Sequence, residues 1–131
     1  MIKLGDLVLP EDLILEGEFE WVPVRAETGR TLGGRLVVWE DRIEGGRPLD
    51  LVATEASGWL SRAQAEALRE MASEPGATYT LLCGPDGQEK SFTVRFRHED
   101  APVLELWPVV PRPFYEPGDL YYGRIKLMEV G

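Results

Sequence analysis

The chain has 131 residues, of which 44% are hydrophobic and 28% charged, a balance that is typical of one folded domain and excludes a disordered chain. Its 23 Asp and Glu residues against 14 Lys and Arg residues give a formal net charge of -9, which disfavours phosphate binding and argues against a bare nucleic-acid-binding protein. One cysteine and one histidine leave no disulfide framework and no zinc cluster within the chain, so we expect a single domain over residues 1–131 that is stabilised by packing.

The N-terminal segment, MIKLGDLVLPEDLILEGEFE, has acidic residues and Pro10 between its apolar residues. It lacks the uninterrupted apolar run of a signal peptide or a membrane span, so we expect a protein that stays in the cytoplasm where it is made, without contact to a membrane. Period-two spacing would place Glu16, Glu18 and Glu20 on one face of a strand. Such carboxylates can serve a hydrolase or a hard cation, but any half-exposed strand shows the same alternation.

The middle of the chain contains two segments of dense apolar content, residues 34–40 and 49–54, joined by a charged stretch with two glycines. This pattern predicts a long hairpin. A tighter hairpin is predicted from residues 77–83, the turn GPDGQ, and residues 90–98, because Phe92, Val94 and Phe96 alternate with polar residues.

A helix is predicted between these two hairpins, over about residues 61–74, from the stretch LSRAQAEALREMASEPG. Ser61 and Gln64 have the spacing of a capping box, and Pro75 with Gly76 ends the helical pattern. Leu68 and Met71 lie on one apolar stripe with Ala65 and Ala72, so we expect this helix to pack on the sheet.

The last strand is predicted over residues 121–130. The segment before it holds five prolines, at positions 102, 108, 111, 113 and 117, which favours an edge strand followed by a loop. Together these elements predict a mainly β (α+β) fold, an antiparallel β-sandwich or split barrel with one flanking helix.

No catalytic, cofactor or metal site is expected, and we therefore predict that the protein is not an enzyme. His98 is the only histidine and is expected to be solvated at the end of a strand. Cys83 has no basic neighbour in the sequence that would activate its thiol. The carboxylates named above remain the weak alternative.

The aromatic residues are a stronger sign of function, because Trp and Tyr are favoured in protein interfaces. An aromatic group lies in and beside the proline-rich segment: Trp107, Phe114, Tyr115, Tyr121 and Tyr122. It is expected either in the core or, where exposed, in contact with another subunit.

The order of elements, and the stretches RTLGGRLVVWE, GRPLDLVAT, WLSRAQAEALREMASEPGATYTLLC, SFTVRFRH and YYGRIKLMEV, resemble small tail proteins of siphophages and prophages. These have the tail-tube fold, which is shared by tube proteins and by the first domain of distal tail proteins. The resemblance implies a structural subunit in the tail of a virion, made in the cytoplasm of the host bacterium. It implies a homo-hexameric ring at the distal tail or baseplate, around the DNA channel, with adjacent tail and baseplate proteins as partners.

The resemblance also implies where the subunits meet. The hairpin over residues 35–54 would be an arm that reaches the next subunit or ring, with Trp39, Glu40, Asp41, Arg42 and Glu44 as interface candidates beside the aromatic group. An acidic lumen would let DNA pass without adhering. A full distal tail protein usually has a second domain, whereas this sequence ends at Gly131, which favours a ring or adaptor over a receptor-binding role. The alternative is a monomeric, non-enzymatic binding module that uses the loop over residues 107–122.

Overall fold

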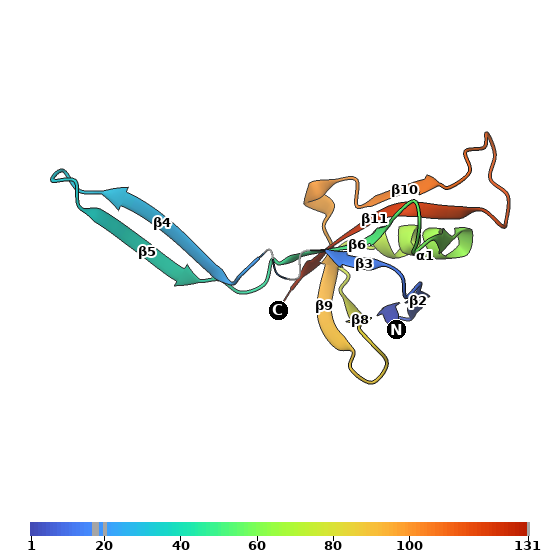
Figure 1. Cartoon of the computed structure of the whole chain (residues 1–131), viewed down its shortest axis with the longest axis horizontal. Helices are drawn as coiled ribbons and strands as arrows, with labels where there is room; N and C mark the ends of the chain where they lie inside the picture. The colour runs from blue at the N-terminus through green and yellow to red at the C-terminus, as the bar shows by residue number, and fades with distance from the viewer. Residues whose placement is uncertain (17–18, 20, 131) are drawn as a thin grey trace.

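The structure is a computed structural model that describes residues 1–16, 19 and 21–130. It has a body built on one large antiparallel sheet and a two-stranded arm that stands away from the body (Figure 1). The strands of the body are β1 (Ile2–Leu4), β2 (Leu7–Leu9), β3 (Ile14–Glu16), β6 (Pro48–Ala53), β7 (Leu60–Ser61), β8 (Tyr79–Cys83), β9 (Lys90–Phe96), β10 (Leu104–Pro108) and β11 (Leu120–Glu129). The body also contains the helix α1 (Arg62–Ala72) and the 3-10 helix η1 (His98–Asp100), and the arm consists of β4 (Val24–Arg30) and β5 (Leu36–Arg42).

The longest strand, β11, organises the body because it pairs with four other strands. One of its edges pairs with β7 and β6, and the other pairs with β10 and β9. The sheet then continues from β9 to β8, β1 and β2, and from β6 to β3. The predicted class, mainly β with a large antiparallel sheet and one flanking helix, is confirmed.

The core lies between the curled sheet and α1. Leu81, Phe96, Ile125 and Leu127 point into it from three strands, and Leu68 does so from the helix; each is at most 2% exposed. Figure 1 shows α1 lying alongside β10 and β11. The predicted helix is therefore confirmed as a packing element on one face of the sheet.

The helix begins as its sequence predicts. The Ser61 hydroxyl accepts a hydrogen bond from the Gln64 backbone N–H at 3.1 Å, and the Gln64 side chain accepts one from the Ser61 N–H at 2.9 Å. These two bonds satisfy backbone donors that have no partner inside the helix. The helix ends at Ala72, shortly before Pro75.

The hairpin predicted from residues 77–83 and 90–98 is confirmed as β8 and β9, which pair in register from Tyr79–Val94 to Cys83–Lys90. Val94 and Phe96 are buried, whereas Ser91 and Thr93 on the other face are exposed. The predicted last strand is likewise confirmed as β11.

The long hairpin predicted from residues 34–40 and 49–54 is wrong. β5 pairs with β4, and β6 pairs with β11 and β3 in a different sheet. The reason is that Leu49, Leu51 and Ala53 are core residues, so β6 takes a place inside the body sheet. The arm is therefore the hairpin β4–β5 and not the segment 35–54.

The edge strand expected in the proline-rich segment is confirmed as β10, for which the described part of the chain gives one pairing, with β11. Gly123 makes this pairing possible. Its φ is +143°, and a Cβ at this position would overlap the carbonyl oxygen of Glu105 on β10. The loop over residues 109–119 then carries the chain from β10 to β11.

Candidate interaction surfaces

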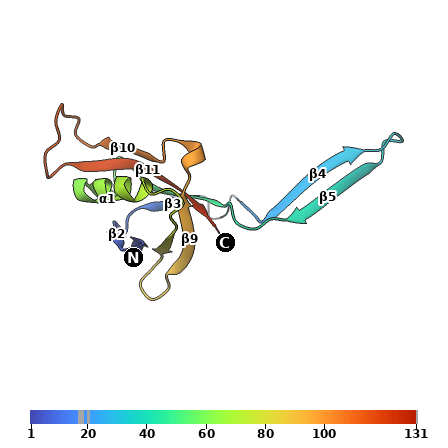
Figure 2. The ribbon, with the colours of Figure 1, turned by 180° about the vertical axis from the view of Figure 1, so that it is seen from behind.

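The arm is exposed along almost its whole length. Within the described residues, β4 and β5 form a sheet of their own. Every residue of both strands is exposed except Gly29 and Val37, which are intermediate. Figures 1 and 2, seen from opposite sides, both show the arm extending away from the body. The arm thus buries almost none of its side chains within one chain.

Its two faces differ in character, because residues that pair across the strands share a face. One face carries four apolar residues, whose exposure is about half for the three larger ones: Val24, Ala26, Leu36 and Val38. The other face carries Trp39, whose ring lies over Gly29. Trp39 remains 60% exposed. The arm therefore has an apolar stripe on one face and an indole on the other.

The arm ends in an ordered turn. The Thr31 N–H donates to the Arg35 carbonyl at 2.9 Å, the Gly34 N–H donates to the Thr31 carbonyl at 2.9 Å, and the Arg35 N–H donates to the Thr31 hydroxyl at 3.1 Å. Leu32 at the tip is completely exposed. A large apolar side chain is thus presented at the end of the arm.

The base of the arm is fixed to the end of β11. The Gly46 N–H donates to the Glu129 carbonyl at 2.7 Å, and the Glu129 N–H donates to the Arg47 carbonyl at 2.8 Å. The Arg47 guanidinium lies 3.5 Å from the Glu129 carboxylate and 5.9 Å from the centre of the Phe92 ring. These contacts give the arm a defined origin on the body.

The loop between β10 and β11 is the second projecting element, at the opposite end of the long axis from the arm (Figure 1). Ion pairs brace it: Arg112 lies 3.1 Å from Asp119 and 3.3 Å from Glu116. The Asp119 carboxylate also accepts a hydrogen bond from the Glu116 N–H at 2.9 Å. Phe114, between these anchors, is 86% exposed. The loop therefore holds an exposed aromatic side chain in a defined position.

Arg62 joins this loop to the helix. Its guanidinium lies 3.8 Å from the centre of the Tyr115 ring, a cation–π distance, and donates a hydrogen bond to the Tyr121 hydroxyl at 3.0 Å. That bond, together with the one to Glu66, raises the pKa of Arg62 above its ordinary value. The cation is thus fixed as a support for Tyr115.

The aromatic candidates from the sequence divide into three groups. Phe114 and Tyr115 are exposed on the loop, and Trp107 is 58% exposed on β10, paired with the half-buried Tyr122 on β11. The prediction of Tyr121 as an interface residue is corrected, because Tyr121 is only 8% exposed and belongs to the core, so its ring offers no free surface. Of the charged candidates, Glu40, Asp41 and Arg42 are exposed on β5 and Glu44 is exposed at its base.

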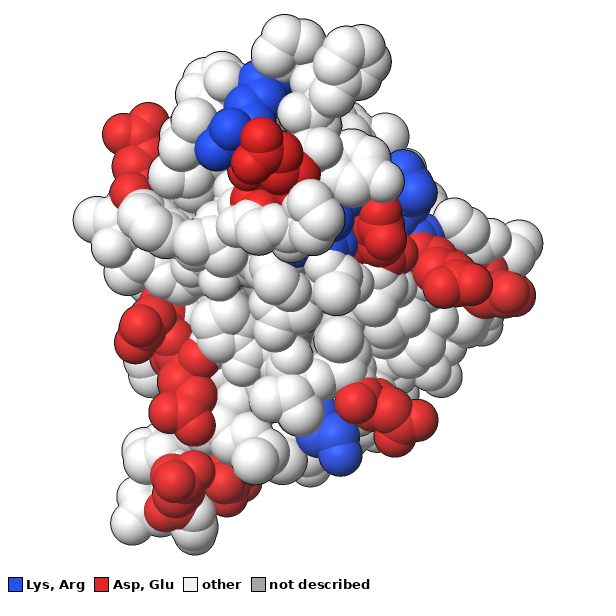
Figure 3. Space-filling view, turned by 90° about the vertical axis from the view of Figure 1, so that its right-hand side faces the viewer, with Lys and Arg blue, Asp and Glu red and all other residues white. Residues whose placement is uncertain are grey.

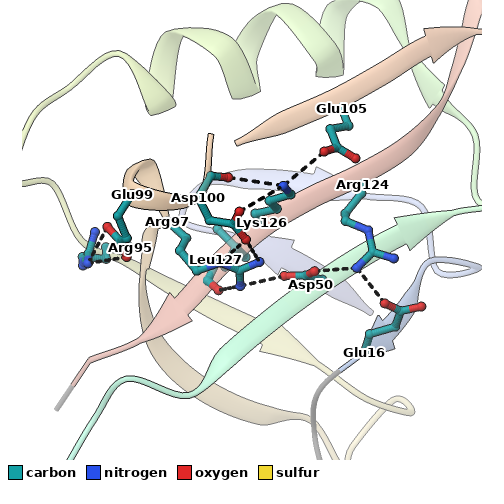
Figure 4. A network of polar contacts seen from close by, with 10 residues as sticks. All are labelled: Glu16, Asp50, Arg95, Arg97, Glu99, Asp100, Glu105, Arg124, Lys126 and Leu127. Carbon is teal, nitrogen blue, oxygen red and sulfur yellow. Dashed lines mark hydrogen bonds and ion pairs between the residues drawn. The ribbon is translucent and has the colours of Figure 1, made fainter. Parts of the chain in front are cut away.

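A network of polar contacts joins β3, β6, β10 and β11 to the segment after β9 (Figure 4). Asp50 on β6 is 8% exposed, and its carboxylate contacts Arg97 at 3.0 Å and Arg124 at 2.6 Å. Arg124 also contacts Glu16 at 2.8 Å, and the hydrogen bond to Asp50 raises the pKa of Arg124. Lys126 contacts Glu105 at 3.1 Å. Because acids and bases alternate in this network, their charges compensate one another and the contacts hold the strands together.

The residues that the sequence suggested as candidates for chemistry make contacts within the fold. The His98 ring lies 2.8 Å from the Ala72 carbonyl at the end of α1, and Cys83 is buried. Of the carboxylates at positions 16, 18 and 20, Glu16 bonds to Arg124, and Glu18 and Glu20 lie outside the described residues. In the part of the chain that the structure describes, no group of three or more His, Cys, Asp and Glu residues is placed to hold a metal ion.

A hollow with a volume of about 520 Å³ lies between β1, β8, β9 and the start of β3. Its floor is apolar, with Ile2, Leu13 and Phe92. The N-terminal ammonium group at its mouth lies 3.5 Å from Asp86 and 3.7 Å from Glu11, so these charges compensate one another.

Sequence reasoning missed β4 and with it the apolar stripe of the arm, as well as Leu32 at its tip and the bracing of Phe114 by Arg112 and Asp119. The doublet Gly33-Gly34 between two β-prone segments was a usable signal for the arm. The bracing ion pairs had no comparable signal, because they depend on the folded path of the loop.

Comparison of the chain with protein-family models, with curated proteins and with solved structures finds no match. In the described residues, no helix has both the length and the apolar character needed to cross a membrane. The two projecting elements are therefore the features of the molecule that bear on its function.

Proposed function

We propose that this protein is a non-enzymatic structural subunit of a bacteriophage tail, or of a tail derived from one, and that six copies form a ring at the distal tail or baseplate around the DNA channel. The arm is the observation that carries this proposal. It is a two-stranded hairpin with free edges and an exposed apolar stripe. A surface of this kind on a folded protein is typical of contact with another subunit.

The energetics of the arm support self-association. An isolated two-stranded hairpin is marginally stable in water, and a third strand or a packed apolar face is needed to hold it. The body offers neither, because β4 and β5 pair only with each other in the described residues. A neighbouring copy supplies the missing surface, by edge-to-edge pairing or by covering Leu36 and Val38.

The charge of the chain suits a ring through which DNA moves. At a net charge of -9 each copy repels phosphate, so a channel lined by six copies lets DNA slide without binding it. Glu40, Asp41 and Glu44 are exposed on or beside the arm, where they can face either the channel or the next ring. Adjacent tail and baseplate proteins are the expected further partners.

Light scattering of the purified protein at low and high concentration tests this proposal. We expect a particle of about six times the 14.7 kDa of one chain, either at all concentrations or as concentration rises. Deletion of residues 24–42, which leaves the body intact, should give a monomer under the same conditions. A wild-type protein that stays monomeric at every concentration, alone and with neighbouring tail proteins, would contradict the ring.

A second candidate function is a monomeric binding module that uses the loop over residues 107–122. The braced, exposed Phe114 favours it, because rigid aromatic residues dominate the binding energy of many interfaces. Deleting the arm separates the two readings. A binding module keeps its ligand after deletion of residues 24–42, whereas the ring loses its assembly.

A further inference from the structure

A second exposed apolar surface lies at the end of the body opposite the arm. We call it the far-end surface and define it by five residues that are between 36% and 86% exposed: Val8, Trp59, Phe114, Tyr115 and Leu120. They come from three segments that are distant in the sequence. Isolated apolar residues are common on protein surfaces, but a group from several segments marks a site of contact.

Contacts around the start of α1 bring these residues together. The Gln64 side chain donates to the Val8 carbonyl at 2.9 Å, and Leu120 pairs with Ser61, two residues after Trp59. Arg62 supports the Tyr115 ring from below at 3.8 Å. The far-end surface therefore gathers around the start of a capped helix and the adjoining strand, and the braced loop contributes its two aromatic residues, Phe114 and Tyr115.

The surroundings of the far-end surface are acidic. Segments 6–12, 54–66 and 109–120, which supply its residues, contain seven Asp and Glu against Arg62 and Arg112. Figure 3 looks onto this end of the molecule and shows an uncharged centre with carboxylates at several places around it and fewer basic groups. An apolar centre with an acidic border is complementary to an apolar partner that carries positive charge.

The distal half of the arm has this character. Residues 28–38, TGRTLGGRLVV, contain Arg30 and Arg35 and no acidic residue, in a chain whose net charge is -9. They also carry Leu32, Leu36 and Val38, all exposed. The basic, apolar end of the molecule is thus separate from its acidic, apolar end.

One chain cannot join these two surfaces, because they lie at opposite ends of its long axis (Figure 2). Two copies can join them, with the arm of one on the far end of the next. Such a contact uses different surfaces on each side and leaves a free arm and a free far end, so it repeats until it closes into a ring or grows as a filament.

We propose that the far-end surface is the docking site for the distal half of the arm of a second copy, so that copies assemble head to tail. This inference deepens the proposed ring and rests on the self-association assumed there. The occupant is residues 28–38 of the neighbour. Leu32, Leu36 and Val38 cover the apolar centre, and Arg30 and Arg35 face the acidic border.

Two double variants test the contact from its two sides. In the arm variant, Leu36→Asp and Val38→Asp place charge on the apolar stripe. In the far-end variant, Val8→Asp and Phe114→Asp do the same on the docking site. A control variant, Ser91→Asp with Thr93→Asp, adds equal charge at exposed positions of β9 outside both surfaces. Thermal unfolding with circular dichroism first checks that each variant is folded.

Light scattering then measures the mass of each variant in solution and tests whether the contact forms. We expect the control to assemble like the wild type, and each double variant alone to stay monomeric. A mixture of the two variants should form a one-to-one complex that grows no further, because it combines one intact arm with one intact far end. Raising the salt concentration should weaken that complex, since opposite charges contribute to it.

The other outcomes separate this inference from the proposed function. A far-end variant that assembles like the wild type, or a mixture that forms no complex while the wild type does, would overturn the head-to-tail contact and leave the ring standing. A complex of the mixed variants, with a wild type that forms open filaments and no hexamer, would support the docking site and overturn the ring.

Discussion

The body and the arm of this protein differ in what holds them in shape. The body closes its own core, in which Leu68, Leu81 and Leu127 are completely buried. The arm has the same strand geometry and a similar share of Val and Leu, yet almost everything on it is exposed. The same residue types thus stabilise the chain in one region and remain available to a partner in the other.

A sequence that favours an extended strand therefore does not by itself make that strand stable. β-branched and aromatic residues favour an extended backbone, but the free energy comes from burying them, at about 25 cal/mol per Å² of apolar surface. In the body the sheet and α1 supply the covering surface. For the arm it has to come from another molecule, and its stability should therefore depend on protein concentration.

Hydrogen exchange should reveal the largest contrast between the two regions. Under conditions that keep the protein monomeric, we expect amides of β4 and β5 to exchange almost as fast as in an unfolded peptide, because opening an isolated hairpin costs little free energy. Amides of β11 should open only with the whole body, at about 5–15 kcal/mol. Raising the concentration should protect the arm selectively. Equal, high protection of arm and body in the monomer would contradict the comparison.

Truncation of apolar side chains should show the same contrast in the free energy of unfolding. Phe96 is 2% exposed and packs edge-to-face against Tyr79, so Phe96→Ala should cost about 3–5 kcal/mol. Leu36→Ala, which truncates an apolar side chain of the arm, should alter the stability of the monomer by less than about 0.5 kcal/mol. Urea unfolding measures both. A large loss for Leu36→Ala would mean that the arm is packed within one chain.

The ionic network should contribute to the body mainly through its buried carboxylate. Asp50→Ala removes the β6 partner of Arg97, whose side chain is 11% exposed and keeps its contacts with Asp100 and with the Leu127 carbonyl, and should cost about 1.5–3 kcal/mol of unfolding free energy. The control replaces both partners, Asp50→Leu with Arg97→Met, and should recover most of this loss because neither half of the pair is left without the other. A double variant as unstable as Asp50→Ala would assign the effect to packing.

Most of the body could be predicted from the sequence because its signals are local. The Ser61–Gln64 capping box, the alternation of Phe92, Val94 and Phe96, and the prolines before β11 each fix an element without knowledge of the rest of the fold. Each of these patterns is compatible with one kind of local structure, and the structure contains that element.

The pairing of β5 could not be settled in this way, since Gly33-Gly34 and Gly45-Gly46 mark turns equally well on its two sides. The choice is made by β11, which pairs with β6 over six residues and leaves β5 to β4. The burial of Tyr121 could not be predicted either. Tyr121 and Tyr122 are adjacent in the sequence and point to opposite faces of β11, and only the fold decides which face is buried.

The smallest effect on stability is expected at the surface of the body, where Glu99 contacts Arg95 at 2.8 and 3.0 Å. A hydrogen bond from its own backbone N–H, and then the bond from Arg95, lower the pKa of Glu99. The ionised form therefore favours folding above the ordinary carboxyl pKa, and this contribution is lost as the pH falls through the lowered pKa of the folded state. Glu99→Gln should be slightly less stable than the wild type at neutral pH, and the two should converge in acid. Urea unfolding at both pH values measures the difference, and one that persisted unchanged in acid would show that the charge of Glu99 has no part in it.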